Sequence, residues 1–362
     1  MSGTDPALAD GLAAVMRSHP FPAADSDGAL FRSLSQGGWL EFFELGLSGQ
    51  EGICLAESLL AGEALGTFAV PPGVMSAAGY VVPLLKRLGS DAPLCSRISD
   101  LLAAGERIAV ALPSGRQTVS ASAAAGMVRL NGSVDRVTGL DCGRALVPVQ
   151  FDGSSAFALI DTGGRGVTVK CHESVVVGQM CGELQFDDTP IPASDILTDH
   201  NGAATQYAAT VFSLLLDVHA VGVAAECLRR SVAYTATRHQ FGQPVGAFQA
   251  VQHMAAEILV RVETSRSAVW SAASALASGS PDAPELIAAS RLHCMLSAQT
   301  AAEIAIQMHG GAGFTWEYGL HHFYRAAMFA RHYLTHEHGV RASLAASIRR
   351  SSRMHAEIGA AA

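Results

Sequence analysis

The sequence predicts a multidomain α+β protein with an N-terminal helical domain, a middle antiparallel β domain and a C-terminal four-helix bundle. Near both ends of the chain, apolar residues recur at the three- and four-residue spacing of helices. The middle instead holds short apolar runs separated by Gly, Asp and Ser. Because 362 residues exceed one typical core, we expect three domains, at residues 1–105, 106–199 and 200–362.

The N-terminal domain is expected to consist of short helices. Leu55, Leu59, Leu60 and Ala64 follow the helical spacing and define one buried face. The Gly-Gly and Pro-Pro pairs near residues 37 and 71 are ordinary loop signals. The expected helices cover residues 7–16, 29–34, 49–64 and 78–102, the last broken by short turns.

The middle domain is expected to be an antiparallel barrel or sandwich. Its apolar runs have the length of strands, and turn residues separate them at short, regular intervals. Residues 201–204 are expected to form a linker to the bundle. The expected strands cover residues 108–112, 127–130, 145–150, 156–161, 167–169 and 184–186.

The C-terminal domain is expected to contain four longer helices joined by short connections, each spanning roughly 40 Å at about 1.5 Å per residue. Short connections between helices of similar length are typical of a bundle. These helices are expected over residues 206–237, 248–276, 284–308 and 320–348.

Composition excludes several classes of protein. Apolar residues make up 49% of the chain and charged residues only 15%, which favours a large packed core. A net charge of -8 argues against a nucleic-acid partner, since phosphate binding needs clustered basic residues. The most apolar window, residues 207–216, is about half as long as a membrane span. No basic region precedes an apolar core at the N-terminus, and the seven cysteines lack a Cys-x-x-Cys pair. We therefore expect a cytoplasmic protein without a membrane partner, a metal site or disulfides.

Two stretches interrupt the predicted bundle, at residues 238–252 and 307–315. Arg238 offers a planar fork of donors suited to a pyrophosphate, and the glycines at 242, 310, 311 and 313 allow main-chain N–H groups to approach a ligand. Phe241 and Phe248 can wall the apolar side of such a ligand, and Gln307 can bind a hydroxyl. The stretches therefore predict a dinucleotide site. The alternative is that they are ordinary helix-terminating turns, for which Gly242 and Pro244 would suffice.

The order of domains, together with Arg-x-x-Phe-Gly-x-Pro-x-x-x-Phe-Gln from residue 238 and Gln-x-x-Gly-Gly-x-Gly-Phe-Thr from residue 307, resembles the acyl-CoA dehydrogenase family. The resemblance covers the whole chain in architecture. It implies that these two stretches bind the adenosine half of an FAD whose flavin ring lies in the neighbouring subunit. The implied cofactor contacts are Arg238, Gln240, Phe241, Phe248, Val251, Gln307, Gly310 and Gly311.

The β domain departs from the family pattern where the flavin ring is held. Active members carry a loop resembling Thr-Glu-Pro-x-x-Gly-Ser-Asp and a later Trp-Ile-Thr. The matching places here read Ala-Leu-Pro-Ser-Gly-Arg-Gln over residues 111–117 and Arg-Val-Thr over residues 136–138. The acidic residue, the Gly-Ser-Asp and the tryptophan are missing. We expect the chain's own flavin-ring pocket to be eroded.

The catalytic base of the family is also missing. Removing the α-proton of an acyl thioester needs a carboxylate in a dry site, where its pKa rises toward neutrality. The two positions that the family uses correspond to Phe212 and Leu334, neither of which can take a proton. No catalytic residue is assigned. Asp217 and Glu337 are candidate replacements, with a charge on a helix face and a loop salt bridge as their alternative roles.

The resemblance implies an FAD-dependent oxidoreductase of lipid metabolism, and three hypotheses follow. In the first, the chain is the non-catalytic subunit of an α2β2 enzyme like those of actinobacterial steroid side-chain degradation. It donates FAD contacts to a homologous subunit that bears the glutamate, and it is inactive alone. The complex desaturates an acyl-CoA and passes electrons to an electron-transferring flavoprotein. The second hypothesis is a self-sufficient homotetramer, either with Asp217 or Glu337 as base or with flavin chemistry that needs no strong base. The third is a flavin-free scaffold. The acyl substrate cannot be read from the sequence.

Overall fold

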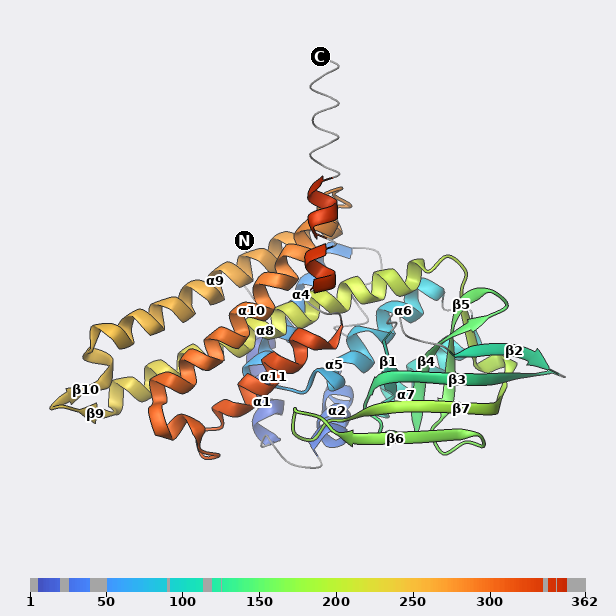
Figure 1. The fold of residues 1–362 in the computed structure, drawn as a ribbon, viewed down its shortest axis with the longest axis horizontal. Helices are drawn as coiled ribbons and strands as arrows, with labels where there is room; N and C mark the ends of the chain where they lie inside the picture. Colours follow the sequence, from blue (N-terminus) through green and yellow to red (C-terminus); the bar gives the residue numbers. More distant parts are fainter. Residues whose placement is uncertain are drawn as a thin grey trace, which may run out of the picture. The chain divides into compact units, whose positions relative to one another are not determined.

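The structure, a computed structural model, describes residues 6–19, 26–39, 51–89, 92–112, 119–124, 126–334, 338–342 and 344–349. The chain forms two compact units. One comprises Met1–Gln50 and Val70–Phe212, and the other comprises Glu51–Ala69 and Ser213–Ala362. Figure 1 shows the helices and strands of both units, with labels on most of them. We call them the β-containing unit and the bundle unit.

Short helices precede the sheet in the β-containing unit. Helices α5 and α7 each have a proline at their first helical position, where the missing N–H costs no hydrogen bond. Gln179, which lies between two strands, accepts a hydrogen bond of 3.0 Å from the main-chain N–H of Gly73 and so ties α5 to the sheet. The helices are α1 (Pro6–Ser18), α2 (Ser26–Gln36), α5 (Pro72–Gly79), α6 (Val81–Leu88) and α7 (Pro93–Ala103).

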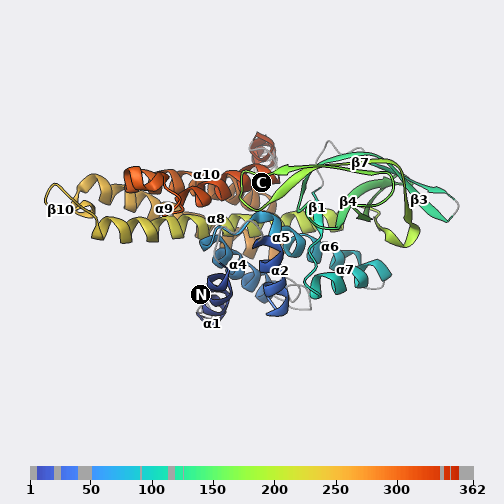
Figure 2. The ribbon, with the colours of Figure 1, turned by 90° about the horizontal axis from the view of Figure 1, so that it is seen from below.

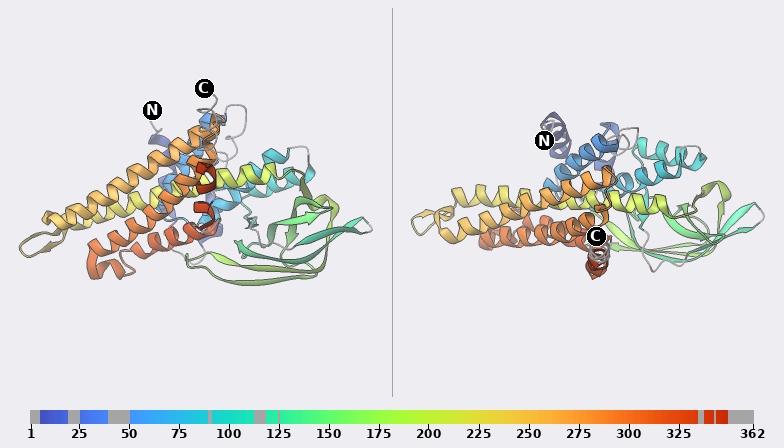
Figure 3. Two further views of the ribbon diagram at one scale, coloured as in Figure 1. Left: turned by 45° about the horizontal axis from the view of Figure 1, so that its top comes forward. Right: turned by 90° about the horizontal axis from the view of Figure 1, so that it is seen from above.

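Eight strands of the described residues form one sheet, with the order β6-β7-β3-β1-β4-β5-β8 and with β2 paired to both β3 and β4. Most neighbours are antiparallel, but β4 runs parallel to β1 and to β2. The long strands β3 and β7 lie side by side (Figure 3). The strands are β1 (Ala109–Ala111), β2 (Ser120–Ala124), β3 (Met127–Thr138), β4 (Arg144–Phe151), β5 (Ser154–Asp161), β6 (Val167–Glu173), β7 (Met180–Pro192) and β8 (Ile196–Asp199).

Aliphatic side chains from alternate strand positions fill the core of this sheet. Val128, Leu130 and Val134 of β3 are buried, as are Val147 of β4 and Leu184 of β7. The alternation along β3 is the pattern expected of a strand with one packed face. Burial of this apolar cluster is the main interaction that stabilises the sheet.

The bundle unit contains the long helices. Glycines allow α4 and α8 to approach closely, because a β-carbon at Gly222 would lie 2.0 Å from the carbonyl oxygen of Glu63. Figure 2 shows α8, α9 and α10 alongside one another, with the small β9–β10 hairpin at one end. The helices are α4 (Glu51–Thr67), α8 (Ala203–Thr237, of which the part from Ser213 belongs here), α9 (Gln249–Ala277), α10 (Ala283–His309) and α11 (Leu320–Tyr333).

The predicted fold class is confirmed: helices, then a largely antiparallel sheet, then long helices follow one another along the chain. Helix α4 falls within the first predicted segment but packs with the bundle helices, since Gly62 and Gly66 fit it against α8. By length and composition α8 could cross a membrane, yet 78% of its apolar window is buried inside the protein.

Candidate functional site

The first predicted stretch forms a hairpin at the end of α8. Strands β9 (His239–Gln240) and β10 (Gln243–Pro244) pair antiparallel across Phe241 and Gly242. Both turn residues have left-handed backbones, with φ of 52° and 81°, as two-residue hairpins of the common twisted type require. The main-chain N–H of Val245 donates to the carbonyl oxygen of Arg238 at 2.7 Å, closing the hairpin against the helix.

The side chains of this hairpin point to solvent. The ring of Phe241 is 93% exposed, and it meets the half-buried ring of Phe248 edge to face with 6.2 Å between centroids. Arg238 is exposed, and within the described residues no carboxylate pairs with its guanidinium. The amide of Gln240 donates to the neighbouring carbonyl oxygen of His239. The hairpin therefore presents a cation and an aromatic ring that the described part of the chain does not use.

The second stretch follows α10. Gln307 is exposed in the last turn of that helix, and Gly310 has a left-handed φ of 57° that ends it. The next five residues, Gly310–Phe314, form the short 3₁₀ helix η3. A β-carbon at Gly311 would meet no described atom within 4 Å, whereas one at Gly313 would lie 2.5 Å from the carbonyl oxygen of Ile306. Internal packing therefore requires glycine at 313 but leaves open space at 311.

Ring stacking brings the two stretches to the same end of the bundle unit. The ring of Tyr234, one turn before Arg238, stacks on His309 with 4.3 Å between centroids. Tyr318 meets both rings edge to face, and its carbonyl oxygen accepts a hydrogen bond of 3.2 Å from Arg230. Burial lowers the pKa of His309, so the stacked imidazole is neutral at pH 7. The rings of Tyr234, His309 and Tyr318 thus pack together where the two exposed stretches meet the helices.

A pocket of about 340 Å³ lies beside the hairpin. Its lining is apolar or neutral, and it includes Val251, one of the predicted cofactor contacts. Half of its lining residues belong to the first predicted stretch, and the others come from the adjoining parts of α8 and α9. The lining residues are Val232, Thr235, Ala236, Pro244, Gly246, Val251, Gln252 and Ala255.

The two positions of the family base hold apolar side chains in the structure as well. Phe212 is completely buried in α8, and its ring meets Tyr80 edge to face with 6.3 Å between centroids. Leu334 follows the last residue of α11. The described residues place no carboxylate at either position, so these two positions supply no base.

Asp217, a candidate replacement base, lies in the interior of the bundle unit. One carboxylate oxygen accepts a bond of 3.1 Å from Arg291, and the other accepts one of 3.1 Å from the hydroxyl of Ser290. Arg291 also donates to the carbonyl oxygen of Ala330 in α11. Burial raises the pKa of Asp217 to about 6, although Arg291 opposes the shift.

The expected charge on a helix face is therefore wrong for Asp217, because the side chain is 0% exposed and ties three helices together. Both of its oxygens are already engaged by chain groups. Reaching a thioester would require breaking a buried ion pair. Glu337, the other candidate, lies outside the described residues.

The strand that corresponds to the family's Trp-Ile-Thr is distorted. The pairing of β3 with β7 shifts register between Val134 and Val137, and Arg136 at the bulge has a left-handed φ of 58°. Thr138, the one residue that matches the family pattern, is buried. A bulge re-aims the side chains around it. The remainder of the predicted flavin loop, residues 113–117, lies outside the described residues.

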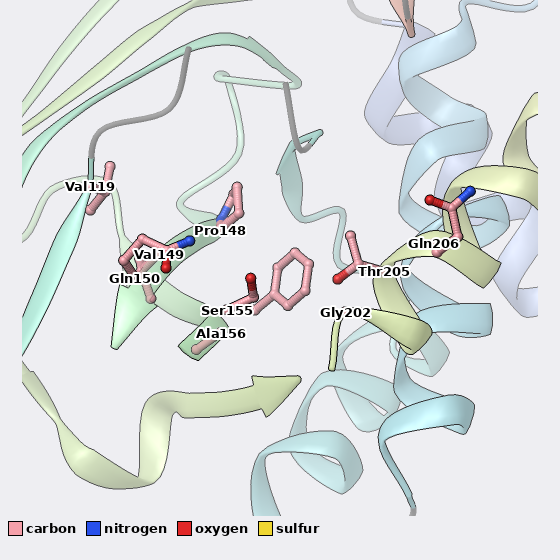
Figure 4. Close-up of a pocket in the computed structure, with 10 residues that line it drawn as sticks. Val119, Pro148, Val149, Gln150, Ser155, Ala156, Gly202, Thr205 and Gln206 are labelled. Atoms are coloured by element: carbon pink, nitrogen blue, oxygen red, sulfur yellow. The ribbon is translucent and has the colours of Figure 1, made fainter. Parts of the chain in front are cut away.

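A second pocket, of about 160 Å³, lies in the β-containing unit between the sheet and the first turn of α8 (Figure 4). Gln150, Ser155, Thr205 and Gln206 supply its polar atoms, and Phe157 supplies an aromatic wall. Asp199 caps the helix here by accepting bonds from Thr205. Sequence reasoning missed this pocket, since its residues belong to no motif.

The exposed end of the bundle unit fits part of a dinucleotide. A guanidinium without a carboxylate partner in the described chain can bind a pyrophosphate, and the amide of Gln307 can bind a hydroxyl. The open backbone at Gly310 and Gly311 permits close approach of a ligand. The described residues of the β-containing unit offer no matching support for a flavin ring at the strand bulge.

Sequence comparison supports the same family. Residues 205–334 match the family model of the acyl-CoA dehydrogenase C-terminal domain. The chain is 33% identical over 186 residues to the probable acyl-CoA dehydrogenase FadE25 of Mycobacterium tuberculosis, covering 50% of this chain and 48% of that protein. It is 36% identical over 115 residues to the acyl-CoA dehydrogenase IpdE2 of the same organism, covering 32% and 34%. The chain thus spans about half the length, or less, of these curated relatives.

Solved structures share the fold over nearly the whole chain. The butyryl-CoA dehydrogenase of Megasphaera elsdenii has a TM-score of 0.81 and 20% identity, with coverage of 96% of this chain and 99% of that one. The ChsE4-ChsE5 complex of Mycobacterium tuberculosis has a TM-score of 0.78 and 23% identity, with 98% of both chains covered. At these identities the likeness shows the fold alone.

Proposed function

Because this chain belongs to the acyl-CoA dehydrogenase family, we propose that it is the non-catalytic subunit of a two-chain acyl-CoA dehydrogenase. It would act in the cytoplasm, beside a homologous chain that carries the glutamate. Its role in the complex is to complete the FAD site of that chain with its own exposed bundle end. The complex would desaturate an acyl-CoA between the α and β carbons.

One observation supports this proposal: the chain keeps the cofactor-binding residues of the family site but lacks its catalytic base. Arg238, Phe241 and Gln307 are exposed and presented outward, whereas Phe212 is completely buried where a base would stand. A self-sufficient enzyme needs both parts. A subunit that only completes a partner's cofactor site needs the first part alone.

In the complex, Arg238 would pair with the FAD pyrophosphate, and Gln307 would bind a hydroxyl of the adenosine or ribityl portion. Phe241 and Phe248 would cover the apolar side of the cofactor, next to the pocket that contains Val251. FAD supplies the acceptor for the hydride from the β carbon. The residues of this chain contribute binding and orientation, and none of its described residues moves the α-proton.

The proposed substrate class is a bulky acyl-CoA such as a steroid side-chain thioester. The support is the family resemblance, together with the structural likeness to a complex described as a steroid acyl-CoA dehydrogenase, at a TM-score of 0.79 and 21% identity. Electron-transferring flavoprotein is the proposed acceptor, as is usual in the family. Both assignments depend on the identity of the partner chain.

The test is to purify the chain alone and together with its genomic neighbour, provided that the neighbour is a homologue with the glutamate. We expect no flavin and no acyl-CoA oxidation from the chain alone. The complex should contain one FAD for each pair of chains and should oxidise acyl-CoA. Stoichiometric flavin and turnover by the chain alone would refute the proposal.

The competing homotetramer with a relocated base has a direct test as well. Its described candidate, Asp217, is engaged by Arg291 and Ser290, which argues against a catalytic role. The double variant Asp217→Asn, Glu337→Gln covers both candidates. Loss of turnover in a chain that is still folded would favour the homotetramer, and unchanged turnover of the complex would exclude it.

A further inference from the structure

Phe212 stands at the position of the family base and contacts a second buried aromatic ring, that of Tyr80. Phe212 and Tyr80 lie in the same compact unit, both 0% exposed, and they are among the largest fully buried side chains of the protein. Tyr80 stands at the junction of α5 and α6, and Phe212 stands in α8. Their rings meet at an interplanar angle of 70°, an edge-to-face geometry that aromatic pairs favour.

Buried apolar residues also flank Tyr80 on both sides in the sequence. Val74, Met75 and Ala77 of α5 are at most 2% exposed, and Val81 of α6 is fully buried. Each aromatic ring of this kind removes about 150 to 250 Å² of surface from water. The position of the family base is thus part of a dry, filled core.

A working base site has different requirements. The carboxylate needs space for an acyl chain beside it, and the α carbon of the substrate must come within hydrogen-bonding reach of the carboxylate. Replacing a glutamate by phenylalanine alone would remove the proton acceptor but need not fill the neighbouring space. Here a second large buried ring, from the junction of α5 and α6, meets Phe212 edge to face.

We propose that Tyr80 and Phe212 together close this chain's own acyl site, so that the acyl thioester is bound only by the partner subunit. The assignment of Phe212 to the base position rests on the proposed function. Two consequences follow from the closure. Restoring a glutamate by Phe212→Glu does not create activity, because the carboxylate would be buried against Tyr80 without a substrate. The complex also binds one acyl-CoA for each pair of chains.

The experiment measures binding of trans-2-octenoyl-CoA, a product-type thioester, by calorimetry on the full chain alone and on the complex. We expect no saturable binding to the wild-type chain and one molecule for each pair of chains in the complex. The variant Tyr80→Ala, Phe212→Ala should gain a site in the chain alone, with an affinity at least about tenfold above any wild-type binding. Saturable one-to-one binding to the wild-type chain overturns the inference.

Control variants separate an opened acyl site from a general loosening of the core. Phe31, in α2 of the same unit, is also 0% exposed, so Phe31→Ala creates a comparable cavity elsewhere. It should gain no binding. The milder variant Phe212→Leu serves if the double variant does not fold, and it should bind more weakly than an opened site but above the wild type. A folded Phe212 variant that gains nothing, or a Phe31 variant that gains as much, contradicts the closure.

The flavin content of the same samples distinguishes this inference from the proposed function. A wild-type chain that holds no flavin but binds octenoyl-CoA refutes only the closure. A wild-type chain that holds stoichiometric flavin and oxidises octanoyl-CoA refutes the proposed function itself.

Discussion

Arg291 and Arg238 belong to the same unit and differ in how they use their donors. Arg291 is 4% exposed, and it donates hydrogen bonds to Asp217 and to the carbonyl oxygen of Ala330. Arg238 is exposed at the base of a hairpin, and within the described chain it meets no carboxylate. The donors of Arg291 are therefore used within the fold, whereas those of Arg238 remain available to a ligand or partner. Burial of a charge is tolerated only with such compensation.

The largest expected effect comes from breaking the buried pair. Asp217→Ala leaves the charge of Arg291 uncompensated in the interior, which should lower the free energy of unfolding by about 3 to 5 kcal/mol. Arg238→Ala should change it by less than about 0.5 kcal/mol, since the side chain is exposed. Chemical denaturation followed by circular dichroism measures both. Equal losses in the two variants would show that the contrast between the arginines is mistaken.

The exposed arginine should instead affect the cofactor. In the proposed complex, Arg238→Ala removes charge-assisted hydrogen bonds worth about 1.5 to 3 kcal/mol, or about 10- to 100-fold in FAD affinity. Arg238→Lys keeps the charge but loses the fork, so its affinity should be intermediate. Flavin retention after gel filtration reports the change. Arg261→Ala is the control, because that side chain is paired with Glu257 on α9, and its flavin content should equal that of the wild type.

Two glycines after α10 are also expected to differ, one being needed for packing within the chain and the other for binding the cofactor. Gly313→Ala forces a β-carbon toward the carbonyl oxygen of Ile306 and should cost about 1 to 3 kcal/mol of stability. Gly311→Ala meets open space and should change stability by less than about 0.5 kcal/mol while reducing flavin retention by the complex. Thermal unfolding of the two variants is the measurement. A stability loss at position 311 as large as that at 313 would contradict the assignment.

The pH dependence of stability tests the buried carboxylate of Asp217 a second time. Burial raises the pKa of Asp217 from 3.8 to about 6, so between these values the folded state holds a proton that the unfolded state has lost. Stability from this group is therefore greatest below pH 3.8 and falls as pH rises to about 6, by at most about 1.4 kcal/mol per pH unit.

Subtracting the stability of Asp217→Asn from that of the wild type at each pH isolates this contribution. His322, whose pKa is lowered to about 4 chiefly by burial, changes stability in the opposite direction but is present in both proteins. Arg238→Ala should keep the wild-type slope, since it leaves Asp217, Ser290 and Arg291 unchanged. A difference that does not fall between pH 4 and 6 would mean that Asp217 is ionised throughout.

The sequence predicted the order of the elements but not their exact extents. Strand β2, Ser120–Ala124, was missed because serine and alanine give no apolar run, yet it pairs with β3 through the main chain. Helix α8 starts at Ala203, inside the expected linker, because Asp199 caps it from the preceding strand. The last helix was expected to run unbroken to residue 348, whereas α11 ends at Tyr333 and the described residues are helical again over 338–342 and 344–349.

The exposed part of the candidate site could be predicted, because glycines, an arginine and a phenylalanine at fixed spacing are local signals. Its assembly could not, since the stacking of Tyr234 on His309 joins residues far apart in the chain. The buried roles were also hidden. Nothing local to Asp217 reveals that Arg291 lies across the bundle, and nothing near Phe212 in the sequence reveals that the ring of Tyr80 meets it.

The exposed ring of Phe241 should also affect how long a chain without its partner survives in the cell. A benzyl group that is 93% exposed on a hairpin tip, with Phe314 and Trp316 also largely exposed, is the kind of surface that chaperones bind and that promotes association. Newly made copies without a partner should be held by chaperones or degraded, and assembly would protect them. The cellular amount of this chain should then follow the synthesis of its partner, and producing it alone in a host should lower its soluble yield relative to production together with the partner.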